Sequence, residues 1–216
     1  MASAERVATF RRMSFKAGGG RLVVWVIVGI ALLSGRSFAQ AVDKPLTTRW
    51  EIDATTGVLW RVGGSATPLS YTLLPQIISF KIPPVFERPW AGGTLMMRSR
   101  FSLLLESIER GQARYSLGEA AAGELEWRER AGRAYAFFAA GGGFGWMHSR
   151  GYEIPGGQGQ DFNLNWLMHT GVRYAMRDNW VWSLGVYFQH ISNRGMDKVN
   201  PGLNALGPTL GLAKRF

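Results

Sequence analysis

Residues 50–62 read WEIDATTGVLWRV, and the side chains change character at every second position. The even-numbered positions are mainly apolar and include Trp50 and Trp60, whereas the odd-numbered positions carry Glu51, Asp53 and Arg61. A period of two is that of a β-strand, whose successive side chains point to opposite faces. The stretch therefore predicts a strand with one charged face and one apolar face that has tryptophan near both ends.

The same alternation returns along the rest of the chain. In residues 180–192, for example, Trp180, Trp182, Leu184, Val186 and Phe188 share one face. Counting residues 50–62, eight segments can be drawn; the other seven are 71–82, 94–106, 113–127, 133–148, 162–176, 180–192 and 204–216. Repeated alternating segments of about ten residues are typical of outer-membrane barrels. We therefore predict an all-β fold, an eight-stranded antiparallel transmembrane β-barrel with its apolar faces toward lipid. A soluble lipocalin-like binder is the alternative, and it requires the apolar faces to point inward.

The N-terminal segment has the pattern of a signal peptide. A basic region containing Arg11, Arg12 and Lys16 precedes an apolar run at residues 22–33, which is too short to span a bilayer well. Small residues then stand at cleavage spacing, at 39–41 or 37–39. We predict that residues 1–41 are a signal peptide and that residues 42–216 form the barrel.

Charge and cysteine content exclude several classes of function. The whole chain carries a net charge of +10, but half of this excess lies in residues 1–41, which leaves +5 for the barrel. This mild excess suits an anionic surface and falls short of a nucleic-acid binder, so we expect no nucleic-acid partner. The chain has no cysteine, which excludes disulfides and thiolate metal ligands. We expect neither a metal nor a cofactor.

The lengths of the connections fit an outer-membrane barrel. If both termini lie in the periplasm, residues 128–132 and 177–179 form short periplasmic turns, while 149–160 and 193–203 form longer outer loops. Residues 83–93, PPVFERPWAGG, do not fit, because they make a long connection on the short side. The chain ends at Phe216, in a strand with Leu210 and Leu212, which resembles the aromatic-terminated last strand of outer-membrane proteins.

The glycine-rich run at residues 139–145 is not a phosphate-binding loop. It lacks the Lys-Ser or Lys-Thr of such loops and falls inside a predicted strand. Close packing of neighbouring strands explains the glycines better.

One of the three histidines shares a strand face with a serine, an arrangement that suggests catalysis. His148 and His169 lie at a strand end and on a polar face, but His190 and Ser192 continue the apolar face of residues 180–188. Two residues of strand rise place their Cβ atoms about 6.6 Å apart on one side. This is close enough for the hydroxyl to meet the imidazole, as in a base and nucleophile pair. The alternative is that the pair only marks where the strand leaves the membrane.

The residues around this pair resemble a known family. The stretch His190-Ile191-Ser192-Asn193-Arg194-Gly195, followed by Asn200-Pro201-Gly202 and a last strand ending at Phe216, resembles the outer-membrane lipid A 3-O-deacylases (PagL-like acyloxyacyl hydrolases). The resemblance is specific over about 27 residues and elsewhere is one of architecture. It implies hydrolysis of the 3-O-linked acyl ester of lipid A, with His190 as base and Ser192 as nucleophile. It also implies that Asn193 and Gly195 bind the oxyanion.

The resemblance is incomplete at the third catalytic position. The family has a glutamate at the start of the last strand that orients the histidine, and Asn204 stands there in this chain. An amide can accept the imidazole N–H but carries no charge. The alternative function is therefore a non-catalytic barrel, either structural or lipid-binding.

The predicted surroundings of the site follow from its position on the chain. Arg194 and Lys198 lie in the loop after Ser192, where they could attract the phosphates of lipid A. The predicted partners are lipid A or lipopolysaccharide and the lipid of the bacterial outer membrane. The oligomeric state stays open, a homodimer included.

Overall fold

The computed structural model describes residues 49–63, 70–111 and 113–216. The predicted signal peptide, residues 1–41, and its cleavage site lie outside the described residues. Within the described ranges, no helix is long and apolar enough to cross a membrane.

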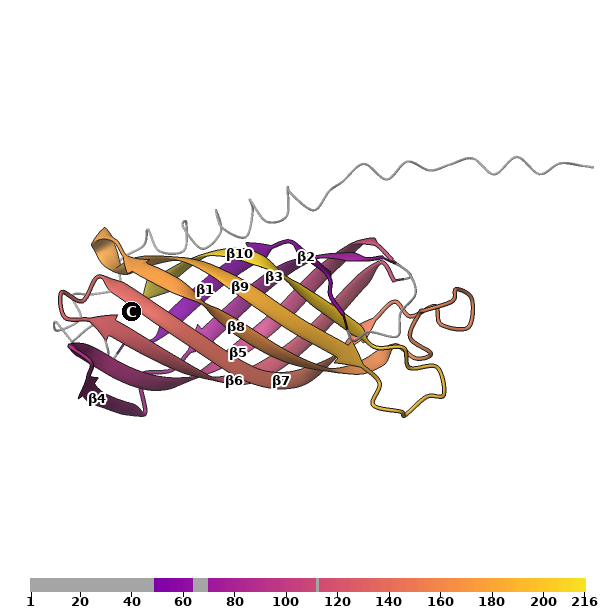
Figure 1. The fold of residues 1–216 in the computed structure, drawn as a ribbon, viewed down its shortest axis with the longest axis horizontal. Helices are drawn as coiled ribbons and strands as arrows, with labels where there is room; N and C mark the ends of the chain where they lie inside the picture. Colours follow the sequence, from indigo (N-terminus) through magenta and orange to yellow (C-terminus); the bar gives the residue numbers. More distant parts are fainter. Residues whose placement is uncertain (1–48, 64–69, 112) are drawn as a thin grey trace, which may run out of the picture.

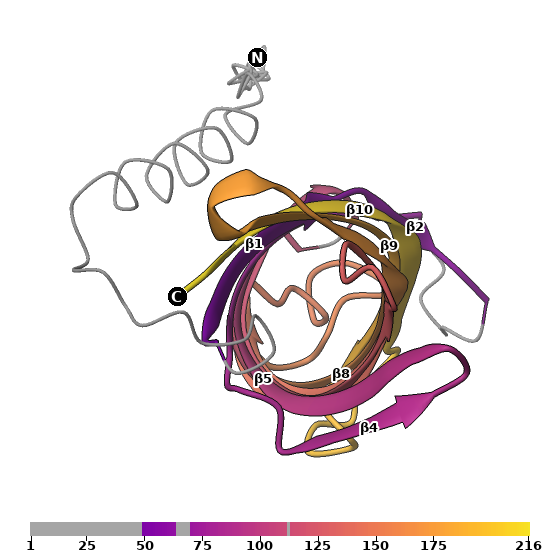
Figure 2. The same cartoon turned by 90° about the vertical axis from the view of Figure 1, so that its left-hand side faces the viewer.

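The described residues form a closed, antiparallel, eight-stranded barrel (Figures 1 and 2). Each strand pairs with the next along the chain, and β1 pairs with β10 from Glu51↔Arg215 to Gly57↔Thr209 to close the ring. The first barrel strand is interrupted at Val58 and so counts as two elements, β1 and β2. The elements of the wall are β1 (Glu51–Gly57), β2 (Leu59–Arg61), β3 (Thr72–Lys81), β5 (Gly93–Arg110), β6 (Tyr115–Glu129), β7 (Ala134–Met147), β8 (Phe162–Ala175), β9 (Trp180–Ser192) and β10 (Leu203–Arg215). The prediction of an all-β, eight-stranded antiparallel barrel is confirmed.

The apolar faces of the strands point outward. Leu103 and Leu210 on the outer face are 44% and 59% exposed, whereas Arg98 and Arg100 on the inner face are each 1% exposed. Aromatic pairs lie near both ends of the wall, with Trp50 stacked on Phe80 at 4.9 Å between ring centroids at one end. This distribution excludes the lipocalin-like alternative, which needs the apolar faces inside.

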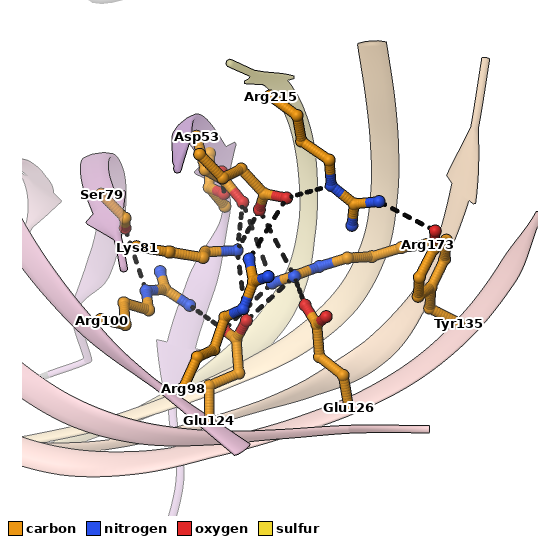
Figure 3. A network of polar contacts seen from close by, with 12 residues as sticks. Asp53, Ser79, Lys81, Arg98, Arg100, Glu124, Glu126, Tyr135, Arg173 and Arg215 are labelled. Atoms are coloured by element: carbon orange, nitrogen blue, oxygen red, sulfur yellow. Dashed lines mark hydrogen bonds and ion pairs between the residues drawn. The ribbon is translucent and has the colours of Figure 1, made fainter. Parts of the chain in front are cut away.

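The inner faces of the strands meet in a buried cluster of ion pairs (Figure 3). The Glu51 carboxylate contacts Lys81 Nζ at 2.9 Å and Arg215 Nε at 2.8 Å, which ties the first strand to the last. Arg173, on β8, extends into the lumen and contacts Glu124 on β6 at 2.9 Å. Buried charges require such partners because leaving one unpaired costs several kcal/mol. The ion-pair cluster therefore links side chains of the first, last and intervening strands inside the barrel.

The glycines of β7 allow close contact with β6. A Cβ at Gly141 or Gly143 would clash with the carbonyl oxygen of Ala121 or Glu119 on the neighbouring strand. The structure thus confirms that the glycine-rich run is a packing feature of the wall.

The two ends of the barrel differ in their connections. The terminal end, where Phe216 N bonds Trp50 O at 2.9 Å, has short turns at residues 130–133 and 176–179, the second containing the 3₁₀ turn η2 (Arg177–Asn179). The loop end carries the longer connections 148–161 and 193–202. Residues 83–93, which the short-turn pattern did not accommodate, contain an additional strand at the terminal end, β4 (Phe86–Trp90).

Candidate active site

The predicted base and third residue are direct neighbours on adjacent strands near the loop end. His190 on β9 pairs with Asn204 on β10 and with Trp166 on β8, and Ser192 pairs with Leu164 one pleat further along. Directly opposed residues of antiparallel strands point to the same face. The outward-facing row Asn204–His190–Trp166 therefore follows from the register of three strands.

The structure brings His190, Ser192 and Asn204 into one hydrogen-bonded chain. His190 Nε2 lies 2.9 Å from Ser192 Oγ, and His190 Nδ1 lies 2.6 Å from Asn204 Oδ1. Because an amide oxygen can only accept, Nδ1 carries the proton and Nε2 presents its lone pair to the serine hydroxyl. This is the tautomer that a general base for Ser192 needs.

Asn204 is held so that its oxygen, not its nitrogen, faces His190. Its Nδ2 donates to Gly63 O at 3.4 Å, and its backbone oxygen accepts from Val62 N at 3.0 Å and from Tyr71 Oη at 2.6 Å. An asparagine side chain can otherwise turn end for end and present a donor to Nδ1, which would select the wrong tautomer. Residues just after β2 and just before β3 thus hold the backbone of Asn204 and orient its amide, a role that the sequence did not reveal.

An aromatic ring covers the imidazole on the side opposite Asn204. The Trp166 ring lies 5.9 Å from that of His190 and 4.9 Å from that of Phe188, between centroids. This packing limits rotation of the imidazole away from Ser192. Sequence alternation placed Trp166 on the outer face, but its contact with His190 depends on the register between β8 and β9.

Both predicted oxyanion residues are hydrogen-bonded within their own loop. Gly195 N donates to Asn193 Oδ1 at 2.9 Å, while Asn193 Nδ2 donates to Val199 O at 3.0 Å. Asn193 N donates to Asn200 Oδ1 at 3.0 Å, so Asn200 keeps an amide donor that bonds no other atom in the described part of the chain. Arg194 and Gly195 have φ values of 54° and 81°, which form the tight turn behind Ser192.

The predicted phosphate-binding residues lie on the surface of this loop. Arg194 and Lys198 are both exposed, and neither contacts His190 or Ser192 in the described structure.

Two aspartates of the long connections at the loop end are engaged with other residues. Asp197 accepts a bond from Tyr152 Oη at 2.9 Å, which joins the two long loops and raises the pKa of Tyr152. Asp161 accepts bonds from Ser149 Oγ and Ser149 N, and these lower its pKa. Neither carboxylate supplies the charge that Asn204 lacks.

Comparison with known proteins identifies a family over most of the barrel. The family model described as lipid A 3-O-deacylase (PagL) matches residues 78–213. A solved structure titled "Crystal structure of the outer membrane enzyme PagL" is similar with a TM-score of 0.55 and 17% identity, over 74% of this chain and 97% of that chain. At this identity the structural likeness supports the fold alone. No curated protein matches the chain.

Proposed function

This chain belongs to the lipid A 3-O-deacylase (PagL) family, and we propose that it hydrolyses the 3-O-linked acyl ester of lipid A in the outer leaflet of the outer membrane. The observation that carries the proposal is the chain of hydrogen bonds from Asn204 through His190 to Ser192. It lies on the outer face of the wall, where an ester within the membrane can reach it.

In the proposed reaction Ser192 Oγ attacks the ester carbonyl while His190 Nε2 takes the hydroxyl proton. The bond between the acyl carbonyl carbon and the 3-oxygen of the sugar then breaks, and His190 returns the proton to this leaving oxygen, which becomes the 3-hydroxyl. Water, activated by the same imidazole, hydrolyses the acyl-serine and releases a free fatty acid. The products are the fatty acid and lipid A with a free 3-hydroxyl group.

The loop after Ser192 is the proposed oxyanion site. Asn193 and Gly195 can donate to the oxyanion only if the bond between them and the bond to Val199 O open when substrate binds. The uncommitted amide of Asn200 is a further donor in the same loop. One well-placed donor contributes about 3 kcal/mol to transition-state stabilisation.

The proposed placement in the membrane puts this site in the outer leaflet. After removal of residues 1–41, residues 42–216 would cross the membrane with the terminal end in the periplasm, and the outward apolar wall supports this arrangement. Arg194 and Lys198 would then meet the phosphates of lipid A from the outer side.

The competing interpretation, a non-catalytic barrel, rested on Asn204. The structure weakens this objection, because the amide oxygen accepts the Nδ1 proton as a carboxylate would and only the charge is missing.

Mass spectrometry of lipid A from cells with and without the protein tests the proposal. We expect expression to remove one acyl group from the 3-position, and cells that express Ser192→Ala to keep it. Unchanged lipid A in the presence of a correctly inserted wild-type barrel would contradict the proposed function.

The missing charge leads to a prediction about Asn204→Asp. Aspartate has the length of asparagine, so it retains the oxygen 2.6 Å from His190 Nδ1 and adds a charge that stabilises the imidazolium. We expect kcat on purified lipid A to rise, by less than the ~10⁴-fold that separates aspartate from asparagine in a serine triad. The gain is limited because the new oxygen faces Gly63 O.

Two further variants control this measurement. Asn204→Leu, which removes the acceptor, should lower kcat, and the longer Asn204→Glu should also exceed wild type if it reaches Nδ1. A folded Asn204→Asp variant that is slower than wild type would mean that the amide has a role of its own.

A further inference from the structure

The strand β4 continues the barrel wall beyond the point where β3 ends. It pairs with β5 from Phe86↔Met97 to Trp90↔Gly93, whereas β3 pairs with β5 only as far as Lys81↔Arg100. In Figures 1 and 2 it lies outside the ring, at the end where the chain terminates. The second edge of β4 pairs with no strand in the described part of the chain.

The outer face of β4 is continuous with the apolar belt of the barrel. Phe86, Met97, Leu125 and Phe138 are paired in one row across β4, β5, β6 and β7. Their exposed fractions are nearly equal, at 44%, 44%, 42% and 45%. The surface that faces lipid on the barrel therefore extends onto β4 without a break.

The side chains on the outer face of β4 change along the strand from an apolar to a basic to an amphipathic aromatic residue. Phe86 is followed at two-residue spacing by Arg88 and then by Trp90, which is 53% exposed. The Arg88 guanidinium lies 5.8 Å from the centre of the Phe86 ring. The opposite face carries Glu87, which contacts Arg128 Nη2 at 3.6 Å. An apolar, then basic, then tryptophan order matches the passage from acyl chains to headgroups.

We propose that β4 is an interfacial anchor whose outer face, Phe86, Arg88 and Trp90, binds phospholipid of the periplasmic leaflet. Phe86 would contact acyl chains, Arg88 a lipid phosphate and Trp90 the headgroup region. The inference rests on the membrane placement given under the proposed function. Pro89 disfavours the alternative of a partner strand on the free edge, because proline lacks the N–H that such pairing uses.

Spin labelling tests the proposal directly, because the chain contains no cysteine. Single variants Phe86→Cys, Glu87→Cys, Arg88→Cys and Trp90→Cys are labelled and reconstituted in phosphatidylethanolamine–phosphatidylglycerol vesicles. Frequent collision of the spin label with oxygen indicates that the label lies in lipid. Frequent collision with a water-soluble nickel chelate indicates that it lies in water. We expect the oxygen-to-nickel ratio to be several-fold higher at 86 than at 87, and to decrease from 86 to 88 to 90 while staying above the value at 87. In a Trp90→Cys protein, Arg88→Gln should lower the ratio at 90.

Two reference positions separate this inference from the membrane placement. Leu210→Cys lies on the outer wall of β10 and should report lipid, and Glu153→Cys lies on an outer loop and should report water. Nickel access at all four β4 positions with Leu210→Cys in lipid would overturn the anchor alone. Protection of β4 from both reagents would also overturn it, because a protein would then cover the strand. Nickel access at Leu210→Cys would overturn the placement and the anchor together.

Discussion

Ser192→Ala and His190→Ala are each expected to abolish the release of fatty acid from lipid A, with a loss of about 10⁶-fold in kcat. In the proposed mechanism Ser192 Oγ forms the acyl-enzyme, and His190 Nε2, 2.9 Å away, removes its proton. Fatty-acid release from purified lipid A in mixed micelles measures the effect. The double variant should be no slower than either single variant, because the two residues act as one unit.

Stability provides the control for this result. Both residues are half-buried at the loop end of the outer wall and belong to no buried ion pair in the described structure, so the free energy of unfolding in urea should stay within about 0.5 kcal/mol of wild type. Ser192→Ala with near-normal turnover and an intact barrel would exclude Ser192 as the nucleophile.

Of the variants considered, Arg173→Met is expected to lower the free energy of unfolding most, by about 3–5 kcal/mol. The Arg173 side chain contacts Glu51, Glu124 and Glu126 inside the barrel. Glu51 and Glu124 keep Lys81 as a partner, whereas Glu126 has no second ion pair among the described residues, so removing Arg173 leaves the buried Glu126 carboxylate without its cation (Figure 3). Urea unfolding of the barrel in lipid vesicles measures the change. Arg177→Met, in the exposed turn at the terminal end, is the matched control and should have little effect.

A second substitution tests the electrostatic cause. Adding Glu126→Gln to Arg173→Met removes one uncompensated charge and should restore part of the lost stability. If Arg173→Met costs less than 1 kcal/mol, the ion-pair cluster does not hold the barrel closed.

The strands could be predicted because each strand of the barrel has one charged or polar face and one apolar face. The alternation in residues 180–192 gave the bounds of β9, and that in residues 162–176 gave those of β8 to within one residue. The break at Val58 and the extra strand β4 could not be predicted. The first is a one-residue gap between β1 and β2 that leaves the alternation intact, and the second contains two polar residues and a proline in five positions.

The site residues that could be predicted lie at a fixed spacing within one strand. The residues that could not be predicted reach the site through the register between strands. His190 and Ser192 lie two residues apart, so parity alone placed them on one face. Tyr71 and Gly63 reach Asn204 from more than 130 residues away in sequence. Trp166 meets His190 through a pairing that fixes β8 against β9. Alternation sets which face a residue occupies but not which residue lies beside it.

His190 and Ser192 lie on the outside of a barrel whose lumen is filled with side chains. This position also determines how the proposed enzyme would meet its substrate. A lipid would reach the site by lateral diffusion within the leaflet, in two dimensions. The encounter rate would therefore depend on the mole fraction of lipid A among the surrounding lipids and not on its bulk concentration. Diluting the substrate in the plane with inert lipid would slow turnover even when the total amount of lipid A is constant.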